Sequence, residues 1–315
     1  MHKLLRYYNQ NRMKVWTIIL AIIFILVLIQ VLNNIARDNN KANNQKKSEE
    51  ETASNVVSYR NESKSIITEG SVSEKYQEDF GRIIDEFYTY CINHEPEKAY
   101  QMLAPDTKRV LYQSENQFEN LYYKEKFEGN KKYSFQSWTK SKDIYIYQVK
   151  IFENMLVTGT SSDNYIEDYV TIVPVEDSYK LNINSYIGRK EISKSNSSEL
   201  VTAEVGAVDV YMDYEIYTIR IKNNTDRTIM LDTRQKTDTT FIRDDKNNKF
   251  ESFLYENKEN DLILKPQEAK TIQIKFNDAY RSNINITSIN FTDIVDYEEY
   301  KNNSDITQYE LKIEI

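Results

Sequence analysis

The sequence predicts an α+β domain followed by an all-β domain, both placed behind a single N-terminal transmembrane helix. Three observations support this fold class. An uncharged apolar run covers residues 15–32, apolar residues recur at helical spacing over residues 74–92, and short alternating strands fill most of the chain after residue 199. With 315 residues, the chain is long enough for two domains once a membrane segment is set aside.

The N-terminus begins with a basic stub, residues 1–14, which we expect to be cytoplasmic. Residues 15–32 contain no charge, and at about 1.5 Å per residue they would span roughly 27 Å, enough to cross a bilayer core. Basic residues precede this run, which favours C-terminal domains outside the cytoplasm, although basic residues also follow it. The alternative is a cleaved signal peptide, but no small-residue cleavage site follows the run. We therefore expect a single-pass protein of the cell membrane, which contacts the membrane through residues 15–32.

Residues 33–73 are rich in Asn, Lys, Ser and Glu and have little apolar periodicity. Such a composition cannot bury enough apolar surface to offset the entropy that ordering would remove. We predict a flexible tether here, with an average reach of about 35 Å.

The α+β domain is predicted over residues 74–192. An amphipathic helix opens it, Pro96 begins a second helix, and the Ser114–Gln117 capping box begins a third helix that ends at Gly129. The pattern then changes to alternating strands. The strands predicted for this domain are Tyr133–Lys140, Ile144–Phe152, Met155–Thr160, Tyr165–Val175 and Tyr179–Ile187. Helices followed by antiparallel strands indicate an α+β layer fold.

Three segments of this domain carry a family resemblance: Asn93–Leu103, Gln117–Phe118 and Thr171–Leu181. With the opening helix, they resemble the nuclear transport factor 2-like superfamily. The resemblance implies a cone, in which three helices pack into a curved antiparallel sheet. It also implies an interior pocket that some members of the superfamily use for catalysis and many do not.

A polar boundary at Ser193–Glu199 separates the second domain, residues 199–315. Its strands are predicted at Val201–Tyr211, Tyr214–Lys222, Thr228–Leu231, Thr239–Arg243, Phe250–Tyr255, Leu262–Leu264, Lys270–Phe276, Thr287–Thr292 and Tyr309–Ile315. Short strands at this spacing indicate a β-sandwich. Ile216–Asp226 and Leu264–Phe276 resemble immunoglobulin-like domains of bacterial surface proteins. The Cys and Trp of antibody domains are absent, so the resemblance implies the architecture alone.

Composition excludes several classes of function. The net charge is -8 and the Lys and Arg residues are dispersed, which argues against nucleic-acid binding. The single cysteine, Cys91, excludes an internal disulfide and a multi-thiolate metal site. No phosphate-binding loop, dinucleotide-binding glycine pattern, nucleophile elbow or zinc-protease motif occurs. We therefore predict no cofactor and no metal, and assign no catalytic residue.

Four side chains of the first domain are candidate chemical groups. Cys91 lies on the apolar face of the first helix, which predicts a buried thiol. His94 lies in the connection to the second helix, where a solvated loop residue is a simpler interpretation than a general base. Asp85 and Glu86 project away from the apolar stripe and are expected to be wetted.

Three other segments with carboxylates are candidate sites, two of them also in the first domain. Asp163 and Asp168 are the acids that could most readily face the interior of the cone, although nothing in the sequence aims them there. Asp244–Lys249 offers oxygen ligands for Ca²⁺ but lacks the glycine and the final glutamate spacing of a calcium loop. We predict a hairpin turn at that segment.

These features favour a membrane-anchored extracytoplasmic scaffold or adaptor that acts through protein–protein interaction, for example in a cell-envelope, conjugation or secretion assembly. Its partners would be other envelope proteins, and self-association is left open. The first alternative is an anchored protein that binds a small molecule, a peptide or a wall glycan. The second is a hydrolase or isomerase in the cone, which would require a buried carboxylate beside Tyr or His.

Overall fold

The computed structural model describes residues 59–60, 67–68, 74–141, 144–154, 165–281, 284–302 and 306–315. The predicted stub, transmembrane segment and most of the tether therefore lie outside the described residues, as does the strand predicted at Met155–Thr160. Two short strands of the predicted tether are described. These are β1 (Tyr59–Arg60) and β2 (Ile67–Thr68), and both pair in parallel with β3.

The longest described helix is α3 (Glu74–Ile92). Its apolar residues recur every three or four positions, so one face buries Phe80, Ile84, Phe87 and Cys91. Two short helices follow, α4 (Pro96–Gln101) and α5 (Pro105–Val110), and each begins with proline, whose fixed φ suits the first helical turn.

The predicted third helix begins at Glu115, but it is not regular. It runs as α6 (Glu115–Phe118), a π-helical turn η1 (Glu119–Tyr123) and α7 (Lys124–Phe127). Ser114 caps it by accepting a hydrogen bond from the backbone N–H of Gln117. Across the π turn, Tyr122 is buried while the neighbouring Leu121 is 58% exposed.

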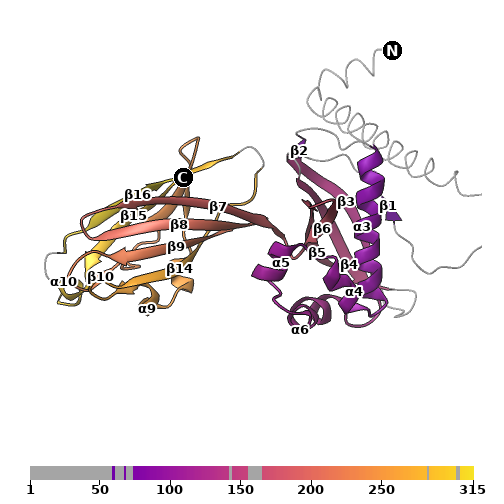
Figure 1. Ribbon diagram of the computed structural model, residues 1–315, viewed down its shortest axis with the longest axis horizontal. Coiled ribbons are helices and arrows are strands. Elements are labelled where there is room, and N and C mark those ends of the chain that lie inside the picture. Colours follow the sequence, from indigo (N-terminus) through magenta and orange to yellow (C-terminus); the bar gives the residue numbers. More distant parts are fainter. Residues whose placement is uncertain are drawn as a thin grey trace, which may run out of the picture. The chain divides into compact units, whose positions relative to one another are not determined.

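A curved sheet lies against these helices (Figure 1). Its main strands are β3 (Lys131–Ser141), β4 (Ile144–Glu153), β5 (Tyr165–Val175) and β6 (Ser178–Asn182). These four strands pair antiparallel in chain order. We call residues 74–185 the helix–sheet region; its core is rich in aromatic rings, which pack at centroid distances such as 5.4 Å for Phe118 and Tyr122.

The rest of the chain, residues 186–315, forms two further sheets and is called the two-sheet region. One sheet has the order β14-β9-β8-β7, and contains β7 (Tyr186–Ser197), β8 (Val201–Tyr211), β9 (Glu215–Asn223) and β14 (Ala269–Phe276). The other contains β10 (Ile229–Met230), β11 (Thr240–Asp244), β12 (Lys249–Glu251), β13 (Ile263–Leu264), β15 (Ile286–Asp296) and β16 (Tyr309–Glu314). Three short helices, η2 (Leu254–Glu256), α9 (Glu259–Leu262) and α10 (Tyr297–Lys301), lie in the connections.

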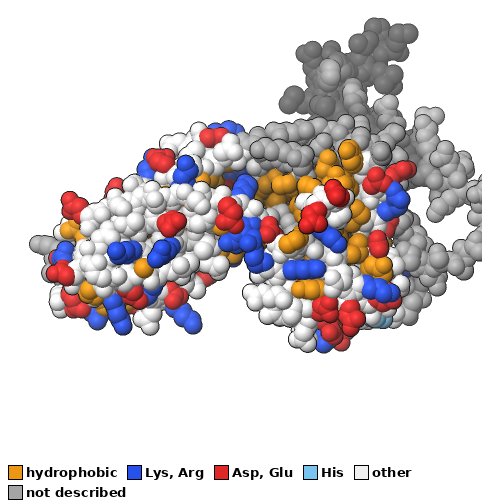
Figure 2. All heavy atoms as spheres, in the orientation of Figure 1, with side chains coloured by type: hydrophobic (Ala, Val, Ile, Leu, Met, Phe, Trp, Pro, Cys, Tyr) orange, Lys and Arg blue, Asp and Glu red, His pale blue; other side chains and the backbone are white. Residues whose placement is uncertain are grey.

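Side chains from both of these sheets form one apolar core. Alternation decides which ones: along β9, Tyr217, Ile219 and Ile221 are buried, and the residues between them are more exposed. Figure 2 shows acidic and basic side chains interspersed on the outer surface in view.

The polar segment predicted as a boundary is part of a strand. β7 continues through it, with Lys194 opposite Val205 and Asn196 opposite Ala203 in β8. The side chains of this half of β7 are mostly exposed, so the segment is polar because of where it lies in the sheet and not because it is a linker. All described residues fall within a single unit of the chain.

The predicted fold class is wrong. The described residues are mainly strands, arranged in sheets of six, six and four, whereas the described helices other than α3 have six residues or fewer. Strand content was underestimated because the exposed, polar half of β7 has no apolar period that would mark it as a strand. No helix among the described residues is both long and apolar enough to cross a membrane.

Candidate functional site

Asp168 is the sequence candidate that the structure places deepest in the helix–sheet region. It lies on β5, on the same face as Val170 and Ile172, and it is fully buried. Its Oδ2 accepts a hydrogen bond from the Tyr122 hydroxyl at 2.8 Å and lies 3.3 Å from Nζ of Lys126, which is also buried. Its Oδ1 accepts the backbone N–H groups of Tyr169 at 2.8 Å and Ser185 at 3.1 Å. Both oxygens are therefore occupied by groups of the protein itself.

Weak acids surround this carboxylate. Burial and the charge of Asp168 raise the pKa values of the Tyr88 and Tyr122 hydroxyls and of the Cys91 thiol. Cys91 is buried, as predicted, and stays a neutral thiol. The Tyr88 and Tyr112 hydroxyls lack a hydrogen-bond partner within the described structure, although Tyr122 lies close enough to Tyr88 to influence its pKa. The interior of this region holds one satisfied carboxylate, which is paired with Lys126 and surrounded by neutral hydroxyl and thiol groups.

The other candidates of this region lie at its surface. His94 is exposed, as expected, and its Nδ1 contacts the Tyr123 hydroxyl. Glu86 is exposed and accepts a hydrogen bond from Tyr90 at 2.9 Å. Asp85 differs from the prediction, since it is half-buried and accepts a hydrogen bond from the Tyr133 hydroxyl at 2.8 Å. Asp163 lies outside the described residues.

Asp244–Lys249 forms the predicted hairpin turn. It joins β11 to β12, where Arg243 is paired with Lys249, and the Asp244 carboxylate accepts the backbone N–H groups of Lys246 and Asn248. Within the described ranges, no group of three or more His, Cys, Asp or Glu side chains is placed to hold a metal ion.

A pocket of about 320 Å³ opens in the two-sheet region, between β7–β9 and the connection from β14 to β15. Exposed basic residues, Lys190, Lys194 and Arg281, lie along it. Its remaining lining is Glu191, Ile192, Val208, Glu215, Tyr217, Asp278, Tyr280, Ile284, Asn285, Ile286 and Ile315. The lining thus combines apolar walls with charged groups of both signs.

Glu215 is the most unusual residue of this pocket. It begins β9 on the same face as Tyr217, so alternation turns a carboxylate towards the interior, and it is only 8% exposed. Its Oε2 accepts a hydrogen bond from the Tyr217 hydroxyl at 2.7 Å. No described group donates a hydrogen bond to Oε1 or forms an ion pair with the carboxylate. Burial, followed by the charge of Asp278, raises the pKa of Glu215 against the opposing effects of Tyr217 and Lys190.

Asp278 is the second buried carboxylate of the pocket, at 5% exposure. It follows β14, whose last residue, Phe276, is paired with Glu215 in the sheet. Its Oδ1 accepts a hydrogen bond from Nη2 of Arg281 at 2.8 Å. Burial raises the pKa of Asp278, although the Arg281 hydrogen bond opposes this. Asp278 therefore has a cation beside it, which Glu215 lacks.

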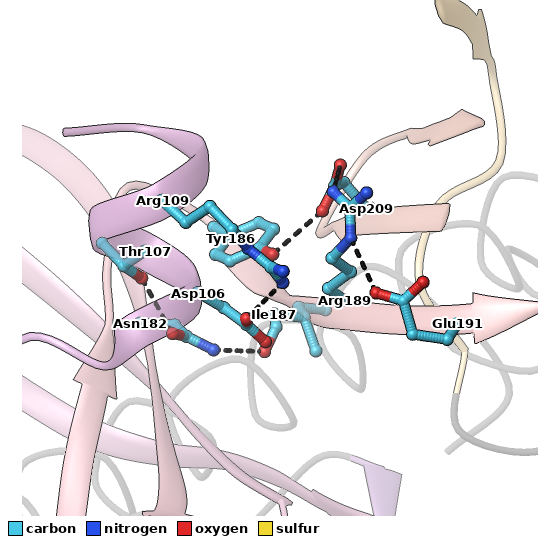
Figure 3. A network of polar contacts seen from close by, with 9 residues as sticks. All are labelled: Asp106, Thr107, Arg109, Asn182, Tyr186, Ile187, Arg189, Glu191 and Asp209. Carbon is cyan, nitrogen blue, oxygen red and sulfur yellow. Dashed lines mark hydrogen bonds and ion pairs between the residues drawn. The ribbon is translucent and has the colours of Figure 1, made fainter. Parts of the chain in front are cut away.

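A network where β7 begins fixes one wall of the pocket (Figure 3). The buried Asp209 accepts hydrogen bonds from the Tyr186 hydroxyl at 3.0 Å and from Nη1 of Arg189 at 2.8 Å. Asn182 bridges α5 to the same strand by accepting from Thr107 and donating to the carbonyl of Ile187. These contacts hold the strand that carries Lys190 and Lys194 into the pocket.

Sequence reasoning missed Glu215 and Asp278. The signal for Glu215 was present, because it occupies an inward position of a strand whose alternation is otherwise apolar. Asp278 had no such signal, since it lies after the end of β14 in an irregular connection.

Comparison with protein-family models, curated proteins and solved structures gave no match to this chain. The resemblances to the nuclear transport factor 2-like superfamily and to immunoglobulin-like domains therefore stay predictions. The function of the chain has to be inferred from the geometry of the pocket.

Proposed function

We propose that this chain is a non-catalytic adaptor that recognises its partner through the pocket of the two-sheet region. The supporting observation is Glu215, a buried carboxylate that faces a cavity with one of its oxygens unused. Tyr217 donates to Oε2 alone, so a ligand in the pocket that donates to Oε1 would add a hydrogen bond to a charged group. A cavity of this volume suits one side chain or small ligand.

The buried carboxylate of the helix–sheet region differs from Glu215 in having no free oxygen. Both oxygens of this carboxylate, Asp168, are occupied, and the tyrosines and the thiol around it are held in their neutral forms. A general base needs a free acceptor within reach of a substrate proton. Asp168 therefore has no free oxygen with which to act as a general base, and we assign recognition to the pocket of the two-sheet region. A place among the envelope proteins stays a prediction based on residues 15–32, which are not described.

Affinity capture of the full chain from its native cells tests this proposal. Wild-type protein would be compared with a Glu215→Gln and Asp278→Asn double variant, and with Glu204→Gln on the exposed face of β8 as the matched control. We expect the same partner to be recovered with wild type and with the control, and to be lost with the double variant. Equal recovery with the double variant, after its fold is checked by thermal melting, would refute a role for the pocket.

A further inference from the structure

We infer that the pocket binds a primary ammonium group at the end of an aliphatic stem, as in the lysine side chain of a partner peptide. This inference rests on the function proposed above, because it names what that same pocket recognises. Three features carry it: Glu215 has no ion-pair partner among the described residues, the nearby cations lie elsewhere, and the walls of the pocket are apolar.

Glu215 lacks a cation of its own. It receives one hydrogen bond, from Tyr217, and no described Lys or Arg lies within ion-pairing distance of it. Ionised carboxylates accept several hydrogen bonds, and buried ones are normally paired with a cation. An ammonium group would donate to Oε1 of Glu215 and supply the missing positive charge.

None of the protein's own cations near the pocket forms an ion pair with Glu215 among the described residues. Arg281 donates to Asp278 at 2.8 Å. Lys190 and Lys194 have exposed side chains, and neither forms an ion pair with the described residues. These exposed bases suit the carbonyl oxygens of a peptide backbone at the mouth, whereas the buried carboxylates suit a cation deeper in the pocket.

Apolar side chains line the way between these two charged zones. Ile192, Ile284 and Ile286 are partly buried walls, and the buried Val208 lies opposite Tyr217 in the sheet. A chain of methylene groups packs favourably against such walls. Lysine meets both requirements, because its flexible stem is apolar and its charge is a compact donor of three hydrogen bonds.

Other ligand chemistries fit less well. An anion would meet two buried carboxylates, Glu215 and Asp278, whose pKa values burial has already raised. A sugar could donate hydroxyl groups to Glu215, but it would leave the negative charge without a counter-ion. Glycan binding is therefore one of the outcomes that the experiment has to distinguish.

The test is the binding of two matched probes to the full chain, measured by calorimetry or NMR titration. One probe is Nα-acetyl-lysine methylamide, and the other is the norleucine analogue, which keeps the stem and lacks the ammonium. We expect wild type to prefer the lysine probe by about tenfold, as for a hydrogen bond between charged groups. Glu215→Gln should remove the preference, and Glu204→Gln should keep it.

The affinity of each probe measured over a pH series adds a readout that a purely packing role of Glu215 would not produce. The groups that face or influence Glu215 are Tyr217 of the same strand, Lys190, Glu191 and Lys194 of β7, and Asp278 and Arg281 after β14. Affinity for the lysine probe should rise with pH as Glu215 ionises, and the norleucine probe should show no such rise. The comparison of probes on wild-type protein holds even if a variant fails to fold.

Equal binding of the two probes would overturn the inference. It would also be overturned if an N-acetylglucosamine oligomer bound more tightly than the lysine probe, through Glu215 and independently of pH. If neither probe binds while partner capture still depends on the pocket, the ammonium inference fails and the adaptor function stands. If capture is also independent of the pocket, both proposals fail.

Discussion

The two regions of this protein each bury a carboxylate beside a tyrosine, yet the two sites differ in what surrounds them. Tyr122 donates to Asp168 at 2.8 Å in the helix–sheet region, and Tyr217 donates to Glu215 at 2.7 Å in the two-sheet region. Asp168 also receives two backbone N–H groups and the charge of Lys126. Glu215 receives nothing further from the described residues and faces a cavity instead.

The comparison shows that burial of a charge does not by itself mark a functional site. A satisfied carboxylate fixes the packing of the elements that reach it, in this case β5, η1 and α7. A carboxylate that lines a pocket with one oxygen unbonded, as Glu215 does, can accept a hydrogen bond from a ligand. The same substitution, acid to amide, should therefore have opposite effects on stability at Asp168 and at Glu215.

The largest effect is expected for Asp168→Asn. The amide cannot accept from all the donors around it, and it leaves the buried Lys126 without a counter-ion. Removing one member of a buried charged pair typically costs about 3–5 kcal/mol. We expect a loss of that size in the free energy of unfolding, measured by urea denaturation at neutral pH.

The matched control for Asp168 is Asp177→Asn, in the exposed turn between β5 and β6, which should change stability little. Cys91 supplies a second readout, because its buried thiol should react with a thiol reagent faster in the Asp168→Asn variant than in wild type. A variant as stable as wild type, with unchanged thiol reactivity, would show that the Asp168 network does not hold the region together.

A smaller loss is expected for Asp209→Asn, where β7 begins. In the variant, an NH₂ group replaces one of the two carboxylate oxygens. Either Tyr186 or Arg189 would then point a donor at another donor and lose its hydrogen bond. Loss of one hydrogen bond between charged groups costs about 1.5–3 kcal/mol. Urea denaturation would measure this, with the exposed Asp213→Asn as the control. Because β7 forms a wall of the pocket, backbone amide exchange over residues 186–194 should be faster in the variant. Unchanged exchange would show that the network does not hold this wall in place.

Much of the strand order was predictable because alternation is a local signal. β8, β9 and β14 were predicted to within one residue at each end, since their inward side chains are apolar at every second position. β7 was missed beyond Ile187 because its exposed side chains are polar and leave no apolar period. Helix boundaries were predicted where proline or a capping residue marks them, as at Pro96 and Ser114.

The candidate sites were predictable to a lesser degree, because they depend on contacts between distant segments. The position of Asp168 in its strand is local, but its partners Tyr122 and Lys126 lie on other elements, across a π turn that no periodicity predicts. The pocket depends on how the β14–β15 connection lies over the sheet. Such a connection has no apolar period that could place it.

The smallest effect, and the one of opposite sign, is expected for Glu215→Gln. A solvated Glu side chain ordinarily has a pKa of 4.5, and burial raises the pKa of Glu215 in the folded protein. Between these two values, the folded state retains a proton that the unfolded state has lost, so wild-type stability falls as pH rises through this window. The amide does not titrate and still accepts the Tyr217 hydroxyl.

We therefore expect the stability of the Glu215→Gln variant to increase relative to that of wild type as pH rises above the ordinary pKa of Glu. Urea denaturation at a series of pH values measures this difference, and the exposed Glu204→Gln should show no comparable trend. A loss of stability for Glu215→Gln at neutral pH would mean that Glu215 is satisfied within the protein, as Asp168 is. The contrast between the two regions would then disappear, and with it the reason for assigning recognition to the pocket.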